Sequence, residues 1–153
     1  SLVHVGDQPG DGDAAKTINN MLSATNLAAA AEALAMGIRA GLDPRRLVDC
    51  VNGGTGGSHA MRHKVGEQVL TGRFGSHFTI GQYLKDLGIA SGLAQDHGVP
   101  APVNAAAHAL WTSHAARGAS DLDHTRLVEL VLADAGIERT WSETTDRRHG
   151  EAE

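Results

Sequence analysis

The chain has 153 residues, a formal net charge of −5 and few aromatic side chains. This length corresponds to about one domain, and the acidic balance disfavours nucleic acid because phosphate binding needs a basic face. No apolar run approaches the ~20 residues needed to cross a bilayer, we see no signal peptide, and the single cysteine, Cys50, cannot form an internal disulfide. We therefore expect a cytoplasmic protein without nucleic-acid or membrane partners.

Residues 1–12 are interpreted as a boundary segment. Residues 2–5 form a short alternating apolar stretch, and three glycines with Pro9 follow between residues 6 and 12, which is a strong turn signal. A lone four-residue strand is not stable by itself. We therefore expect residues 1–12 to be the last strand and the linker of a missing upstream domain.

The longest predicted element is a helix from Ala14 to about Gly37, with Asp13 as its N-cap and Gly41 ending it. Apolar residues recur in it at helical spacing, and at ~1.5 Å per residue it would be about 40 Å long. Alanine, the best helix former, dominates the composition, and Val and Ile are not gathered into alternating runs. These features favour an all-α domain.

Further helices are predicted over residues 45–51, 59–70, 80–97, 101–117 and 123–134. Asp43 and Pro44 start the first of these, Ser58 caps the next, and Gly98 ends the 80–97 helix. Glycines at positions 81, 88 and 92 are expected to admit a neighbouring helix or a ligand. The sequence thus predicts a bundle of about six helices around one long N-terminal helix over residues 13–137, and a disordered charged tail over 138–153.

Lysine is rare in this chain, with Lys16, Lys64 and Lys85 against ten arginines. A lysine can transfer a proton, whereas guanidinium stays protonated, so a retained lysine is a candidate for acid–base chemistry. Lys16 lies in the first turn of the long helix, and Asn20 shares its face one turn later, where the two would polarise a substrate carbonyl. The alternative is that all three lysines are solvated and the Lys16–Asn20 pair has no consequence.

The stretch Gly10-Asp-Gly12-Asp-Ala-Ala-Lys16-Thr-Ile-Asn-Asn20 resembles the catalytic signature of the β-hydroxyacid dehydrogenases, a family that includes 3-hydroxyisobutyrate dehydrogenase and tartronate semialdehyde reductase. Three later blocks match the family in the same order, so that the likeness covers about residues 2–135: Glu32-Ala-Leu-Ala with Gly41-Leu-Asp43, Phe78-Thr-Ile-Gly-Gln-Tyr-Leu-Lys85-Asp86-Leu, and Gly98-Val-Pro100-Ala-Pro102.

This resemblance implies a fold like the C-terminal domain of 6-phosphogluconate dehydrogenase. It also implies a small 3-hydroxyacid substrate and NAD or NADP, bound mainly by an N-terminal Rossmann domain that this chain lacks. Lys16 would be the general acid and base, Asn20 would orient the substrate and Lys16, and Lys85 would lie near the nicotinamide. Asp86 would be structural, pairing with Lys85 or capping. The family further implies a homodimer or tetramer and no metal.

Several features limit this interpretation. The segment from Gly10 lacks the third glycine of a nucleotide-binding loop and a full strand before it, so we expect the isolated chain to be inactive. A helical dimerisation module without catalysis is one alternative. An imine reductase is another, although such enzymes usually lack a lysine at position 16.

His59 and His63 are four residues apart, as in a pair of metal ligands, but no third ligand has recognisable spacing. Trp111 and Trp141 are expected to be packing anchors.

Overall fold

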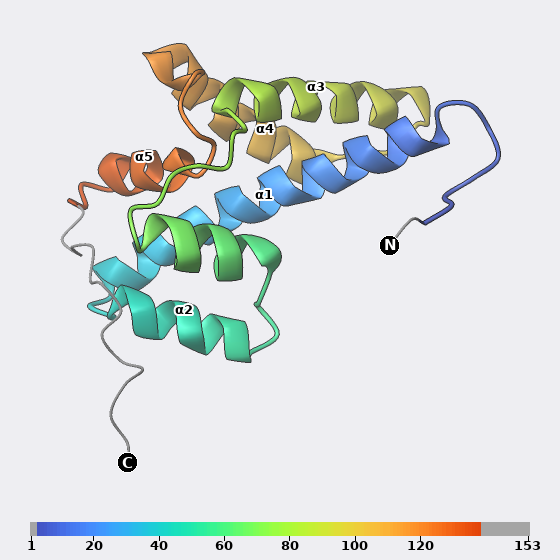
Figure 1. Ribbon diagram of the computed structural model, residues 1–153. Coiled ribbons are helices and arrows are strands. Elements are labelled where there is room, and N and C mark those ends of the chain that lie inside the picture. The colour runs from blue at the N-terminus through green and yellow to red at the C-terminus, as the bar shows by residue number, and fades with distance from the viewer. Residues whose placement is uncertain (1–2, 139–153) are drawn as a thin grey trace.

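The computed structural model describes residues 3–138 and shows an all-α domain (Figure 1). Apart from an isolated β-bridge between Thr79 and Asp123, the regular structure of the described residues is helical. The prediction of about six helices around a long first helix is confirmed. In chain order the elements are α1 (Asp11–Arg39), α2 (Pro44–Gly53), the π-helix η1 (Ala60–Val69), α3 (Ile80–Asp96), α4 (Pro102–His114), its short π-helical continuation η2 (Ala115–Ala119) and α5 (Arg126–Asp134).

Helix α1 is the centre of the fold and packs against α2, η1, α3, α4 and α5. Figure 1 shows α3 and α4 on one side of it and η1 and α2 on the other. Its buried residues all lie between Ala24 and Gly37, and five of them are alanines, whose small side chains let neighbouring helices approach closely. Trp111 on α4 is fully buried, as expected of a packing anchor, whereas Trp141 lies outside the described residues.

The length and hydropathy of α1 correct the expectation that no segment of the chain is apolar enough to cross a bilayer. A window of 18 residues in α1 has a mean hydropathy of 1.3, so by length and composition alone this helix could cross a membrane. Within the domain, 44% of that window is buried against other helices. The core thus accounts for part of the apolar content of α1, whose Ile18, Leu22 and Met36 are exposed.

The start of α1 differs from the prediction. The helix begins at Asp11, with Gly10 at its N-cap in the left-handed region (φ 99°), and Asp13 lies in the first turn rather than at the cap. Asp11 accepts a hydrogen bond from the backbone N–H of Gln8 at 2.8 Å, which extends the helix start. The predicted end is confirmed: Gly41 has φ 84°, and Leu42 N–H bonds to Gly37 O at 3.0 Å in a Schellman motif.

Local capping signals account for the starts of the middle helices. The Asp43 side chain accepts from Arg46 N–H at 2.9 Å with Pro44 in the first turn, and Ser58 Oγ accepts from Met61 N–H at 3.1 Å, as predicted. The helix after Ser58 is a π-helix rather than an α-helix, as the bond from Leu70 N–H to Val65 O shows.

Helix α3 has a capping box that the sequence analysis missed, although its signature was present in Thr79 and Gln82. The last helix begins at Arg126 instead of 123, because Asp123 accepts hydrogen bonds from Ser76 and Thr125 and so fixes the preceding loop.

The predictions for residues 1–12 and for the tail over 138–153 are not tested by the structure. Residues 3–6 have no regular structure, which agrees with the instability of a lone strand, and their assignment to an upstream domain stays a prediction. The predicted tail over 138–153 lies outside the described residues except for its first residue.

Candidate functional site

Lys16 and Asn20 lie one turn apart on the N-terminal half of α1. Lys16 is exposed and makes no hydrogen bond or ion pair with any residue that the structure describes, so its amine is available to a ligand. Asn20 is partly buried, and its Nδ2 donates to Oδ2 of Asp86 on α3 at 2.8 Å. On the other side of the amide, Asn20 Oδ1 lies 3.3 Å from Nδ2 of Asn19.

Helix α3 presents the other predicted residues. Lys85 is exposed, whereas the next residue, Asp86, faces α1 and binds Asn20, because successive helical residues point about 100° apart. The expectation that Asp86 pairs with Lys85 or caps a helix is therefore wrong. The structure brings the three predicted residues Lys16, Asn20 and Lys85 onto two contacting helices, joined by the Asn20–Asp86 bond.

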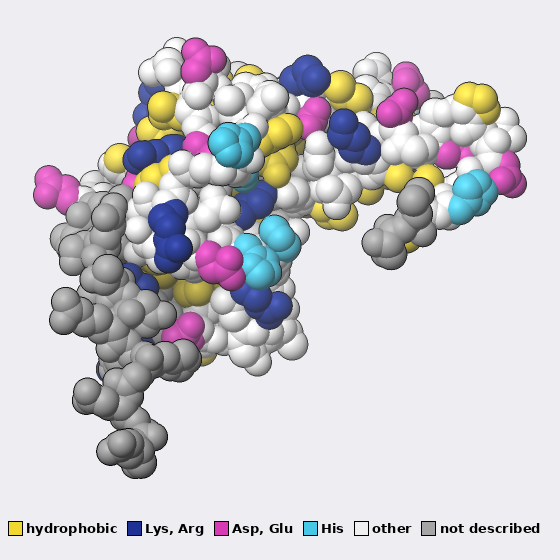
Figure 2. All heavy atoms as spheres, viewed as in Figure 1, with side chains coloured by type: hydrophobic (Ala, Val, Ile, Leu, Met, Phe, Trp, Pro, Cys, Tyr) yellow, Lys and Arg dark blue, Asp and Glu magenta, His cyan; other side chains and the backbone are white. Residues whose placement is uncertain are grey.

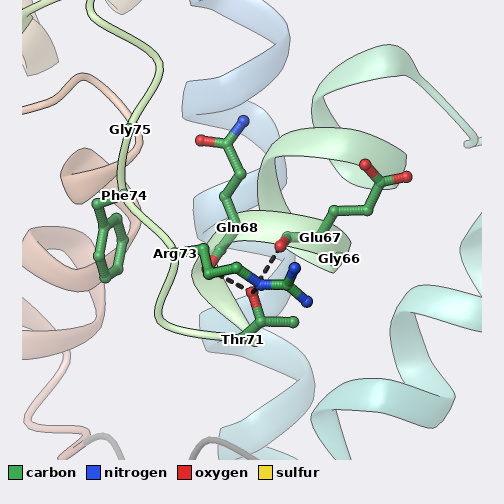
Figure 3. Close-up of a pocket in the computed structure, with 7 residues that line it drawn as sticks. All are labelled: Gly66, Glu67, Gln68, Thr71, Arg73, Phe74 and Gly75. Carbon is green, nitrogen blue, oxygen red and sulfur yellow. Dashed lines mark hydrogen bonds between the residues drawn. The ribbon is translucent and has the colours of Figure 1, made fainter. Parts of the chain in front are cut away.

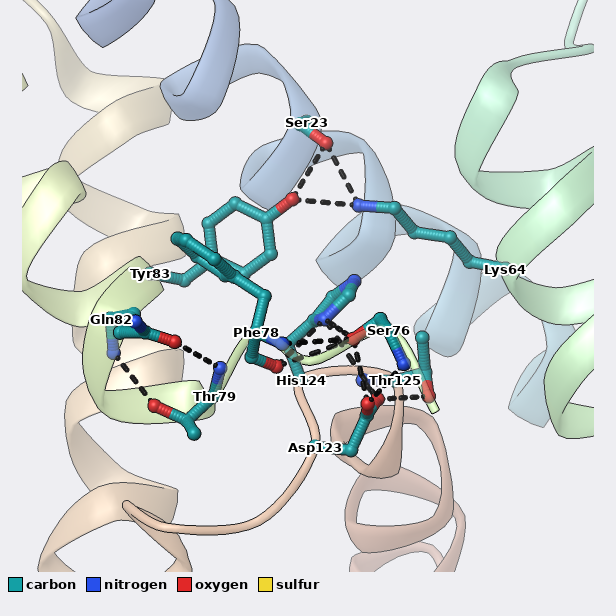
Figure 4. Close-up of polar contacts among 10 residues, drawn as sticks. All are labelled: Ser23, Lys64, Ser76, Phe78, Thr79, Gln82, Tyr83, Asp123, His124 and Thr125. Carbon is teal, nitrogen blue, oxygen red and sulfur yellow. Dashed lines mark hydrogen bonds and ion pairs between the residues drawn. The ribbon is translucent and has the colours of Figure 1, made fainter. Parts of the chain in front are cut away.

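One turn further along the same two helices lies a buried polar cluster (Figure 4). Ser23 Oγ and Tyr83 OH are 2.9 Å apart, and Lys64 Nζ from η1 donates to each of them at 2.8 Å. The Lys64 residue is only 6% exposed, and its ammonium lies 4.9 Å from the centre of the Tyr83 ring. Lys64 is thus a buried cation whose described hydrogen-bond partners are neutral hydroxyls.

The His124 side chain lies next to this cluster, below Ser23 and Lys64 in the view of Figure 4. Its Nδ1 lies 2.8 Å from Ser76 Oγ and 3.1 Å from Phe78 O, which can only accept, so Nδ1 carries the proton. Nε2 is buried and has no hydrogen-bond partner among the described residues. Burial lowers the pKa of His124 to about 4, and the nearby Lys64 ammonium acts in the same direction.

Asp123 is the anchor of the adjoining loop. Burial alone would raise the pKa of its carboxyl, but hydrogen bonds from the hydroxyls and backbone N–H groups of Ser76 and Thr125 outweigh burial and lower the pKa to about 2. This carboxylate therefore holds the 76–79 loop against the start of α5, on the far side of His124 from Lys64 (Figure 4).

Sequence reasoning assigned no role to Ser23 or Tyr83, and it named Lys64 only as one of three rare lysines. The alternative that all three lysines are solvated is wrong for Lys64, which is buried. Ser23 follows Asn20 by three residues and Tyr83 precedes Asp86 by three, so helical spacing could have placed these two beside the predicted site. Nothing in the local sequence of η1 indicates that Lys64 is buried.

Three hollows on the surface of the described residues have no Lys16, Asn20 or Lys85 in their linings. One, of about 680 Å³, lies at the end of η1 and the loop after it (Figure 3) and is lined by Gly66, Glu67, Gln68, Thr71, Arg73, Phe74 and Gly75. Another, of about 460 Å³, lies between the end of α1 and α2. An apolar groove of about 410 Å³ lies between α1 and α3, with Ile18, Met21 and Leu93 among its lining residues.

Hydrophobic side chains are visible on the face of the molecule drawn in Figure 2, and helices α1 and α3 also expose large apolar side chains. Among them are Ile18 (47% exposed), Leu22 (51%) and Ile89 (50%). The rings of His59, just before η1, and His63, on η1, lie with their centres 4.6 Å apart and their planes tilted by 45°, and His63 bonds to Glu67. No group of three metal-ligating side chains occurs within residues 3–138.

Comparison with known proteins gives consistent matches. Residues 10–131 match the family model described as NAD-binding of NADP-dependent 3-hydroxyisobutyrate dehydrogenase. The 2-(hydroxymethyl)glutarate dehydrogenase of Eubacterium barkeri is 33% identical over 136 residues, which are 89% of this chain and 45% of that protein. The 2-hydroxy-3-oxopropionate reductase of Escherichia coli is 34% identical over 122 residues, 80% of this chain and 41% of that protein.

A solved structure supports the same family. The crystal structure of 3-hydroxyisobutyrate dehydrogenase from Salmonella typhimurium superposes with a TM-score of 0.75 at 28% identity, covering 83% of this chain and 44% of that one. The chain thus spans less than half the length of these relatives. On the agreement of sequence blocks, helical architecture and family model, this chain belongs to the NAD(P)-dependent 3-hydroxyisobutyrate dehydrogenase family.

Proposed function

We propose that this chain is the helical half of an NAD(P)-dependent oxidoreductase that interconverts a small 3-hydroxyacid and its semialdehyde or oxo acid. The observation that carries the proposal is the Asn20–Asp86 hydrogen bond of 2.8 Å, which joins the helix of Lys16 to the helix of Lys85. The family membership supports the same reaction class. The isolated chain is expected to be inactive, because the nucleotide would be bound mainly by a Rossmann domain outside these residues.

In this proposal Lys16 supplies the proton chemistry. When the ketone or aldehyde is reduced, the Lys16 ammonium gives a proton to the carbonyl oxygen, and in the reverse direction the neutral amine removes the hydroxyl proton. The nicotinamide cofactor supplies or accepts the hydride. Lys85 fits such a group, since it is exposed and forms no ion pair with the described residues, which leaves its charge free for a polar cofactor.

A helical assembly module without catalysis is the second candidate. The exposed apolar side chains Ile18, Leu22 and Ile89 and the groove between α1 and α3 favour it, because such surfaces mark interaction sites. A homodimer or tetramer is compatible with either candidate. Turnover that depends on Lys16 would distinguish the first candidate from the second.

The test uses the full-length protein that contains this chain. It is assayed with 3-hydroxyisobutyrate, L-threonate, 2-(hydroxymethyl)glutarate and 2-hydroxy-3-oxopropionate, the compounds in the names of the relatives. Lys16→Ala should lower kcat by about 10²–10⁴-fold with unchanged NAD(P)H affinity. Lys16→Arg keeps the charge but cannot release a proton, so it should be equally inactive. Near wild-type turnover in either variant would remove Lys16 from the mechanism. The isolated 153 residues should show no micromolar NAD(P)H affinity by calorimetry.

A further inference from the structure

The Asn20–Asp86 contact determines which end of the Asn20 amide is held by α3. A carboxylate can only accept hydrogen bonds, so the amide atom 2.8 Å from Asp86 Oδ2 is the NH₂ group of Asn20. The carbonyl Oδ1 is then the end that α3 does not hold, and its described contact is a long one of 3.3 Å to the exposed Asn19. Without Asp86, only this long contact with Asn19 would oppose a turn of the amide among the described contacts.

We propose that Asp86 is a positioning residue, and that through this bond it makes Asn20 an acceptor, not a donor, toward Lys16 and the substrate. This inference rests on the proposed function. Lys16 precedes Asn20 by four residues on the same helix face, and its ammonium carries only donors, so Oδ1 is the end of the amide that can bind it. The same oxygen can accept from the hydroxyl of an alcohol substrate.

The inference changes the chemistry expected from sequence. An ammonium and a carboxamide N–H acting together would both polarise the substrate carbonyl. With the NH₂ group bound to Asp86, Lys16 Nζ is left as the donor to the carbonyl oxygen, and it is also the group that transfers the proton. The hydride goes to the carbonyl carbon, the proton goes from Nζ to the oxygen, and Lys16 is left as a neutral amine that Asn20 Oδ1 keeps in place.

An exchange of the two side chains tests the direction of the bond in the full-length protein. Asn20→Asp alone places two carboxylates in contact, so it should lower both the Tm and kcat/KM. The expected loss in kcat/KM is about 100-fold, which lies within the range of interaction energies between residues in contact. In the double variant Asn20→Asp with Asp86→Asn, the amide at position 86 donates to the carboxylate at position 20. An acceptor oxygen again faces Lys16, so the Tm should recover and kcat/KM should rise at least about tenfold above the single variant.

A second variant keeps the inference testable if the exchange fails to fold. Asp86→Leu removes the acceptor and keeps a side chain branched at Cγ, and it should lower kcat/KM about tenfold with unchanged NAD(P)H affinity, since one hydrogen bond is lost. Asp96→Asn is the matched control, because Asp96 is an exposed carboxylate on the same helix, and it should leave both constants unchanged.

Two results would overturn the inference: an exchanged pair that recovers the Tm without any activity, which would show that the Asn20 N–H is needed, or an Asp86→Leu variant of wild-type activity. Failure of the proposed function would appear separately, as absent turnover in the wild-type protein or full turnover in Lys16→Ala. In that case the Tm values of the wild type, Asn20→Asp, the double variant and Asp86→Leu still decide whether Asp86 holds the Asn20 amide by its NH₂ end.

Discussion

Lys64 Nζ donates a 2.8 Å hydrogen bond to Tyr83 OH and lies 4.9 Å from the centre of the same ring, inside the contact between η1, α1 and α3. Its other described partner is the hydroxyl of Ser23. A buried ammonium without a carboxylate partner has lost its hydration for hydroxyl contacts and a weak cation–π attraction. The burial of the Lys64 ammonium therefore lowers the stability of the domain.

We expect Lys64→Met to raise the free energy of unfolding by about 1 kcal/mol. Methionine replaces the aliphatic part of the side chain and removes the buried charge, and Ser23 and Tyr83 keep each other as partners at 2.9 Å. Urea denaturation of the full-length protein measures the change. Arg62→Met on the same helix is the control, since Arg62 is exposed and should change stability by less than about 0.5 kcal/mol. A loss of more than about 1 kcal/mol in Lys64→Met would show that the ammonium stabilises the fold.

We expect stability to fall as the pH is lowered from about 6.5 to 4. His124 has a pKa of about 4 in the folded protein, against 6.5 for an unperturbed histidine, so the unfolded chain binds a proton in this window that the folded protein does not. The shift corresponds to about 3 kcal/mol that is present above pH 6.5 and lost toward pH 4. Burial also lowers the pKa of His114, which acts in the same direction.

The measurement is the free energy of unfolding at several pH values for the wild type and His124→Asn. Asparagine can donate to Ser76 from the position of Nδ1 but does not titrate, so the variant should lose most of the slope above pH 4. Below pH 4 both proteins should lose further stability as Asp123, with a pKa of about 2, becomes protonated. An equal slope between pH 6.5 and 4 in the two proteins would exclude His124 as the source.

A pair of glycines should respond oppositely to alanine. Gly41 has φ 84° at the end of α1, so Gly41→Ala should destabilise the domain by about 1 kcal/mol. Gly92 lies in the interior of α3, and a Cβ there would meet nothing within 4 Å, so Gly92→Ala should stabilise by about 0.5–1 kcal/mol. Thermal unfolding of both variants checks the prediction. A stabilised Gly41→Ala would mean that the Schellman motif does not require left-handed backbone there.

Gly81 shows why glycines of one helix are not equivalent. A Cβ at Gly81 would lie 3.2 Å from Ser120 O, so here the expected close approach of a neighbouring segment is confirmed, whereas Gly92 faces open space. Both residues look alike in the sequence of α3. Only the packing of the chain segment before α5 distinguishes them.

The sequence by itself determined the helices and most of their ends, because caps such as Asp43 and Ser58 and the terminating Gly41 act on backbone groups within a few residues. It also determined that Lys16 and Asn20 share a helix face. Tertiary structure alone decided that Asn20 meets Asp86, 66 residues later, and that Lys64 enters the core beside Ser23, 41 residues earlier. Such contacts depend on how the helices pack, and helical periodicity gives the face of a side chain but not the neighbour it meets.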